Sequence, residues 1–102
     1  MFIAKVNGHV VSTQKISSMI GQKMLVVEPY QVKDGNALRS TGRTLVAVDT
    51  VGAGKGELVL ITQGSSARLA MPDSNTPVDC VIVGIVDSID VGTTKVYEVS
   101  TE

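Results

Sequence analysis

Short apolar runs rich in valine and isoleucine alternate with turn residues along the whole chain. Runs of this length and composition are typical of β-strands. We therefore predict a mostly β chain in which helix is a minor component. The predicted strands are Phe2–Val11, Lys23–Tyr30, Thr44–Val51, Glu57–Thr62 and Val78–Val91, with a hairpin return over Gly92–Ser100.

Glycine stands in the middle of the first and the fifth predicted strands. Gly8 and Gly84 each indicate a bend, a bulge or a close backbone approach, as a strongly curved sheet requires. Five or six strands with such bends, and one short helix between the fourth and fifth, predict a small closed or partly closed barrel. We expect an OB-like barrel in one domain over residues 1–102, with other small barrels left open.

The segments between the strands carry stop and cap signals. Pro29 has no backbone N–H and is expected to end the second strand. Ser65 or Ser66 is expected to cap a short helix within residues 65–71. A turn at 33–36, an irregular polar tract at 37–43 and an exposed loop at 72–77 complete the predicted outline.

Both alternating faces of the strand around Gly84 are apolar. One row holds Val81, Val83 and Ile85, and the other holds Cys80, Ile82 and Val86. A small barrel has a single interior, so the outward row is expected to be covered by another chain. The same doubling occurs in residues 24–27 and 58–61, and the pattern predicts self-association.

The charge balance and the few aromatic residues argue against a nucleic-acid partner. The net charge is −1, so no strong field attracts phosphates. Phe2, Tyr30 and Tyr97 are the only aromatic residues, too few for a surface of stacking rings. The strongly apolar run 81–86 is far shorter than the roughly 20 residues of a membrane-spanning helix, so no membrane partner is expected.

One cysteine and one histidine limit the chemistry further. Cys80 cannot form a disulfide within the chain, and His9 cannot form a histidine cluster. We therefore expect neither a metal nor a cofactor, and we expect the protein to work in the reducing cytoplasm.

A glycine-rich loop, Gly52-Ala-Gly54-Lys55-Gly56-Glu57, is a candidate phosphate cradle. The dinucleotide fingerprint needs G-x-G-x-x-G in front of a helix, whereas this loop has G-x-G-x-G in front of a strand. A P-loop needs Ser or Thr after its lysine, and Lys55 is followed by Gly56. We predict that Gly52, Gly54, Gly56 and Glu57 form a structural turn between two strands.

No catalytic residue is expected. A Ser/His/Asp arrangement has to use His9 with Ser65 or Ser66, and the G-x-S-x-G elbow of esterases is absent. Capping serines and a surface histidine explain the same residues more simply. Asp87 and Asp90 lie near the end of a strand, where acids usually face solvent.

Arg68 follows a polar turn, where one guanidinium can clamp the carboxylate of a ligand or of a second subunit. We favour the subunit boundary. The alternative function is an OB-like module that holds a small anion or a nucleotide at residues 52–57 or at Arg68.

Four segments together resemble the EutN/CcmL family of pentameric vertex proteins from bacterial microcompartment shells, including carboxysomes. The segments are IAKVNGHVVSTQK, VAVDTVGAGKGELVL, QGSSAR and PVDCVIVGIVDSI, in this order from Ile3 to about Ile89. The resemblance implies a small OB-related barrel and a non-catalytic structural protein whose homopentamers close the five-fold corners of a shell.

The resemblance also implies partners and a place for one segment. The expected partners are further copies of the chain and the hexameric shell proteins that make the flat facets. The resemblance places Gly64, Ser65, Ser66 and Arg68 at the subunit boundary and near the five-fold axis.

Overall fold

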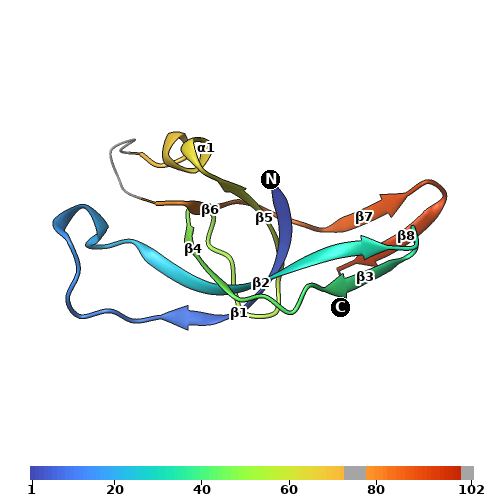
Figure 1. Cartoon of the computed structure of the whole chain (residues 1–102), viewed down its shortest axis with the longest axis horizontal. Coiled ribbons are helices and arrows are strands. Elements are labelled where there is room, and N and C mark those ends of the chain that lie inside the picture. The colour runs from blue at the N-terminus through green and yellow to red at the C-terminus, as the bar shows by residue number, and fades with distance from the viewer. Residues whose placement is uncertain (73–77, 100–102) are drawn as a thin grey trace.

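Five strands close into a barrel, and a short helix packs on its outside (Figure 1). The computed structural model describes residues 1–72 and 78–99. The strands are β1 Phe2–Val10, β2 Lys23–Lys33, β3 Ala37–Ser40, β4 Leu45–Asp49, β5 Leu58–Gln63, β6 Cys80–Ile85, β7 Ser88–Val91 and β8 Thr94–Glu98. The helices are the 3-10 turn η1 Ser17–Met19 and the α-helix α1 Ser65–Leu69.

The barrel strands follow one another in the order β1, β5, β6, β4 and β2, and β2 pairs with β1 to close the circle. The neighbouring pairs are antiparallel except β4 and β6, which run parallel. A closed five-stranded barrel with one short helix confirms the predicted OB-like fold.

A bulge lies beside each mid-strand glycine. The register of β1 against β2 shifts between Val6 and Gly8. The register of β5 against β6 shifts where Leu60 faces Gly84 and Ile61 faces Ile82. A bulge bends its strand and increases the local twist, which helps a short sheet close on itself. The bends expected at the two glycines are confirmed.

Alternate side chains of the five strands fill the barrel interior. The interior cluster consists of Ala4, Val6, Leu25, Val27, Ala47, Ala53, Val59, Ile61, Cys80 and Ile82. Ile61, Ile82 and Val59 are fully buried. Full burial of one such side chain stabilises the fold by about 1.5 to 3 kcal/mol, so each of these residues contributes substantially to the stability of the barrel.

A second apolar cluster lies outside the barrel, between α1 and the sheet. It consists of Val48, Ala67, Met71, Val78 and Val81. Val81 belongs to the outward row of β6, which we expected a second chain to cover. Residues of α1 and the segment after it cover Val81 within the same chain, whereas Ile85 of the same row is 39% exposed. The chain covers one end of this row itself, and a second chain over the rest of the row stays a prediction.

Several element boundaries differ from the prediction. The strand β2 continues through Pro29 to Lys33, because Tyr30–Lys33 pair with residues 37–40 while the Pro29 carbonyl still accepts hydrogen bonds from Thr41. Residues 37–40, predicted to be irregular, form β3 against the outer half of β2. The predicted fifth strand is divided into β6 and β7. Most of the loop predicted at 72–77 lies outside the described residues.

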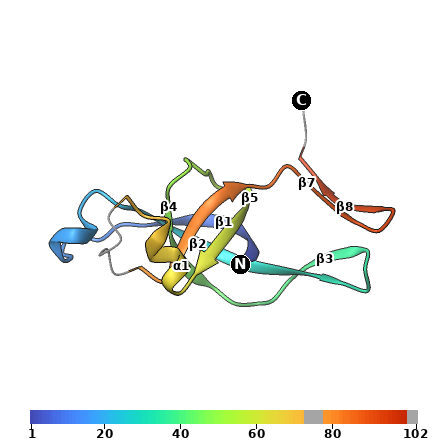
Figure 2. The same cartoon turned by 90° about the horizontal axis from the view of Figure 1, so that it is seen from above.

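Two hairpins project from the same end of the barrel (Figure 2). One is the outer half of β2 with β3, and the other is β7 with β8. The two hairpins approach each other where β8 lies beside β3. They contribute to a longest dimension of 47 Å against 27 and 25 Å for the other axes.

Candidate functional site

The carboxylate of Asp49 organises the first half of the glycine loop. Its Oδ1 accepts hydrogen bonds from the amides of Val51 at 3.0 Å and Gly52 at 3.1 Å. Its Oδ2 accepts the amide of Ala53 at 2.9 Å and lies 3.5 Å from Nζ of Lys23. The Asp49 side chain is only 1% exposed. A buried carboxylate at the end of β4 therefore fixes the path of the chain that follows.

The second half of the loop is tied to β1. The Gly54 amide donates to Oε1 of Glu57 at 2.6 Å. The Gly56 amide donates to the carbonyl of Val6 at 2.8 Å, and the Val6 amide donates to the carbonyl of Glu57 at 2.9 Å. Gly52 and Gly56 have φ values of 80° and 89°, a region that side chains with a Cβ rarely adopt.

The hydrogen bonds of the glycine loop argue against a phosphate cradle at residues 52–57. An anion-binding loop points free backbone amides at its ligand. Here the amides of residues 51–54 and 56 already donate to acceptors of the protein itself, chiefly the carboxylates of Asp49 and Glu57. The loop leads into the strand β5 and not into a helix. The geometry thus disfavours anion binding at residues 52–57.

The segment Gly64–Arg68 begins α1 in a way that the sequence did not indicate. Gly64 is the N-cap with φ of 69°, and no side chain caps the helix, so the predicted capping by Ser65 or Ser66 is wrong. The Gly64 amide donates to the carbonyl of Asp79 at 2.9 Å, which ties the start of α1 to the chain before β6. Glycine takes this positive φ without strain, and the backbone bond fixes the position at which the helix starts.

One face of α1 is buried and the other is open. Ala67 is fully buried against the sheet, whereas Ser65, Ser66 and Arg68 are exposed. Leu69 is also exposed, at 76%. The open side of α1 therefore presents two serines, one cation and one leucine to solvent.

The structure separates the glycine loop from α1 instead of bringing them together. The six residues of β5 lie between them and span about 20 Å. His9 lies on β1 beyond the stretch paired with β5, because that pairing ends at Lys5 with Leu58. His9 is therefore at the loop end of the barrel and the serines of α1 are at the opposite end, so these residues cannot form a Ser/His/Asp arrangement.

Other candidate chemistry is equally unsupported within residues 1–72 and 78–99. No group of three or more His, Cys, Asp or Glu is placed to hold a metal there. Asp90 forms an exposed salt bridge with Lys95 at 3.2 Å. Burial raises the pKa of the Cys80 thiol, with a smaller contribution from Asp79, which disfavours the reactive thiolate. Of the helices in this part of the chain, none has the length and apolar character to span a membrane.

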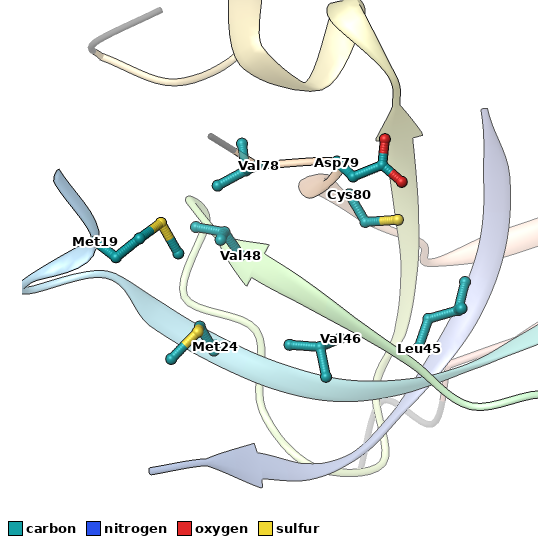
Figure 3. Close-up of a pocket in the computed structure, with 8 residues that line it drawn as sticks. All are labelled: Met19, Met24, Leu45, Val46, Val48, Val78, Asp79 and Cys80. Atoms are coloured by element: carbon teal, nitrogen blue, oxygen red, sulfur yellow. The ribbon is translucent and has the colours of Figure 1, made fainter. Parts of the chain in front are cut away.

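A groove of about 260 Å³ lies between β2, β4 and residues 78–80 at the start of β6 (Figure 3). Its lining consists of Met19, Met24, Leu45, Val46, Val48, Val78, Asp79 and Cys80. Val46, the second residue of β4, is 50% exposed. The sequence pattern signalled this face through the doubled apolar run at residues 24–27, but it did not show that a groove forms there.

Two comparisons with known sequences give consistent results. A family model described as "Ethanolamine utilisation protein EutN/carboxysome" matches residues 1–87. The bacterial microcompartment shell vertex protein PduN of Salmonella typhimurium is 47% identical over 89 residues, which cover 87% of this chain and 98% of PduN.

Solved structures show the same likeness. A structure titled "Ethanolamine utilization protein, EutN" superimposes with a TM-score of 0.87 at 35% identity, over 98% of this chain and 100% of that one. The GrpN pentameric microcompartment shell protein from Rhodospirillum rubrum superimposes with a TM-score of 0.79 at 46% identity, over 90% of this chain and 100% of GrpN.

Proposed function

Because the chain belongs to the EutN/CcmL family, we propose that it is a shell protein whose homopentamers cap the five-fold vertices of a bacterial microcompartment. The observation that carries this proposal is the agreement of fold and sequence over nearly the whole chain with relatives named as shell vertex proteins. The protein is non-catalytic in this proposal, since its conspicuous motifs serve turns and a helix start.

The mechanism is geometric. A cyclic pentamer uses one heterologous interface five times, so each subunit offers two different surfaces to its two neighbours. A ring of five closes at a corner, where flat sheets of hexameric shell proteins leave a five-sided opening. We propose these hexamers as the partners at the rim of the ring.

We place Gly64, Ser65, Ser66 and Arg68 at the subunit boundary, near the five-fold axis. The exposure of the polar side of α1, with Ala67 buried behind it, supports this assignment. The glycine loop has a different role in the proposal: Gly52, Gly54, Gly56 and Glu57 hold the connection between β4 and β5.

The mass of the assembly in solution tests the proposed function directly. Light scattering or native mass spectrometry should give five times the 10.7 kDa mass of the chain. A stable monomer at the concentrations where shells assemble would refute the proposal.

Shell closure tests the vertex role. The chain should convert open sheets or tubes of a hexameric shell protein into closed polyhedra when the two are produced together, and electron microscopy distinguishes these forms. Polyhedra that close equally well without the chain would contradict a vertex function.

The assignment of Arg68 has its own test. Arg68→Ala should weaken the pentamer, measured as the chain concentration at which half of it dissociates, more than Lys55→Ala does. Both residues are exposed cations, so each change removes one charge, but only Arg68 lies on α1. Equal effects would remove the support for Arg68 at the boundary.

A further inference from the structure

The interior face of the barrel changes from apolar to polar at the end where β1 begins and β5 ends. In β5 the interior row holds Val59 and Ile61, and the alternation of side chains makes Gln63 its next member. In β2 the interior row likewise continues through the buried Pro29 to Gln31. Gln31 and Gln63 are both exposed, so two carboxamides stand at this end of the barrel.

A pocket of about 410 Å³ lies at the same end and is called the mouth below. Pockets that bind small molecules usually measure about 300 to 1,000 Å³, and the mouth of a β-barrel is one of their preferred places. Residues of four different segments line the mouth here, among them Phe2, Gln31, Thr41, Arg43, Leu45 and Gln63.

The inner part of the mouth is apolar. Phe2 and Leu45 are partly buried and pack against the interior cluster of the barrel, and both also line the mouth. They lie at the start of β1 and of β4, so they close the pocket toward the core. An apolar body placed on these side chains displaces water from them, which favours binding.

The outer part of the mouth carries a cation whose backbone is held in place. The amide and the hydroxyl of Thr41 donate to the Pro29 carbonyl at 3.0 and 2.9 Å. The Arg43 amide in turn donates to Oγ1 of Thr41 at 3.4 Å. These bonds tie the connection between β3 and β4 to β2, so the Arg43 side chain starts from a fixed point beside the pocket.

The charge of Arg43 is available to a ligand. Its guanidinium forms no salt bridge within residues 1–72 and 78–99. Of the described residues that line the mouth, only Arg43 has a charged side chain. Burial and then Asp79 raise the pKa of the interior Cys80 thiol, whereas Arg43 opposes this shift, which agrees with a guanidinium close to the barrel interior. A guanidinium binds a carboxylate through two parallel N–H donors.

We propose that the mouth binds a small organic carboxylate with a planar, apolar body. The carboxylate pairs with Arg43, and the body lies on Phe2 and Leu45. One guanidinium matches the single charge of a carboxylate better than the charge of about −1.5 to −2 on a phosphate monoester. The inference does not rest on the proposed pentamer, because all the residues used here belong to one chain. It also concerns a different place from the glycine loop, which lies at the opposite end of the barrel.

An NMR titration of the full, isotope-labelled chain with 2-naphthoate tests the site. The methyl signals of Leu45 and the side-chain amide signals of Gln31 and Gln63 should shift with a Kd of about 1 mM or lower. The neutral amide 2-naphthamide has nearly the same shape and should bind at least about tenfold more weakly, because it cannot form a charge-assisted bond. Shifts confined to other residues, no binding of naphthoate, or equal affinity of the two compounds would overturn the inference.

Two charge-removing variants separate the mouth from the other end of the barrel. Arg43→Gln should raise the Kd for naphthoate about tenfold or more. Lys55→Gln removes the same charge from the glycine loop and should leave the Kd unchanged. Both side chains are exposed, so neither change removes a packed core residue. An equal rise of the Kd in the two variants would overturn the inference, whereas a monomeric parent protein would refute only the proposed function.

Discussion

Replacing Asp49 by alanine should destabilise the barrel more than any change to an exposed charge. The Asp49 carboxylate accepts three backbone amides and lies 3.5 Å from the Lys23 ammonium while its side chain is 1% exposed. No other carboxylate among residues 1–72 and 78–99 accepts as many backbone amides. Asp49→Ala removes all these contacts at once.

The magnitude follows from what replaces each contact. Val51 and Gly52 are exposed, so water can bond their amides, and each lost contact costs about 1 kcal/mol. Ala53 is 1% exposed, and its orphaned amide costs about 1 to 3 kcal/mol. The Lys23 side chain is 56% exposed, so its ion pair with Asp49 is treated like a surface salt bridge and contributes about a few tenths of a kcal/mol. The expected total is a loss of about 3 to 5 kcal/mol.

Thermal unfolding at one fixed chain concentration measures this loss, because association also stabilises an oligomer. For a chain of this size, the expected loss lowers Tm by more than about 10 °C. Asp90→Ala is the matched control, since it removes the same charge from a pair whose side chains are 59% and 46% exposed and should cost less than about 1 kcal/mol. If Asp49→Ala costs no more than Asp90→Ala, the assignment of Asp49 as the organiser of the loop is wrong.

Three further outcomes are expected. Gly56→Ala should cost about 1 to 2 kcal/mol in urea unfolding because φ is 89°, whereas Gly8→Ala, at ordinary φ with open space around it, should cost less. Hydrogen bonds from Asn7 and Ser40 lower the pKa of Glu28 in the folded protein. Its contribution to stability is therefore present above the unfolded value of about 4.5 and is lost as pH falls through the lower folded pKa. Glu28→Gln should reduce the loss of stability in this acid range, and an unchanged pH dependence of the free energy of unfolding would contradict the expectation. Burial raises the pKa of Cys80, so iodoacetamide should modify the folded protein at least about tenfold more slowly than the urea-unfolded chain, as mass spectrometry can follow.

The strands and the barrel were predictable because they rest on local patterns. Alternation of apolar residues marks a strand wherever one face is buried, and mid-strand glycine marks the bends that closure requires. The short strand β3 was missed because its four residues show no alternation of apolar and polar side chains and it pairs only with the outer half of β2. The end of β2 was predicted at Pro29 because proline has no backbone N–H to donate. The Pro29 carbonyl still accepts a hydrogen bond from Thr41, and the strand continues beyond it.

The candidate site was less predictable because it depends on contacts between distant segments. The spacing in the sequence argued against a phosphate loop, but the engagement of the loop amides by Asp49 and Glu57 emerged only from the structure. Asp49, three residues before Gly52, was the local signal for this contact, since Asp side chains often accept hydrogen bonds from the backbone amides that follow them. The cap of α1 was assigned to serine because no local signal shows that the Gly64 amide contacts Asp79.

The sequence alone therefore determined the class of fold, the absence of recognisable catalytic motifs and the family, since periodicity, spacing and ordered motifs are properties of neighbouring residues. The tertiary structure decided which apolar rows remain open. Val81 and Ile85 lie in the same apolar row of β6, yet α1 and the segment after it cover Val81 whereas Ile85 is 39% exposed. A strand pattern states that a face is apolar, and only the packing of other segments decides whether the chain covers that face itself or leaves it for a neighbour.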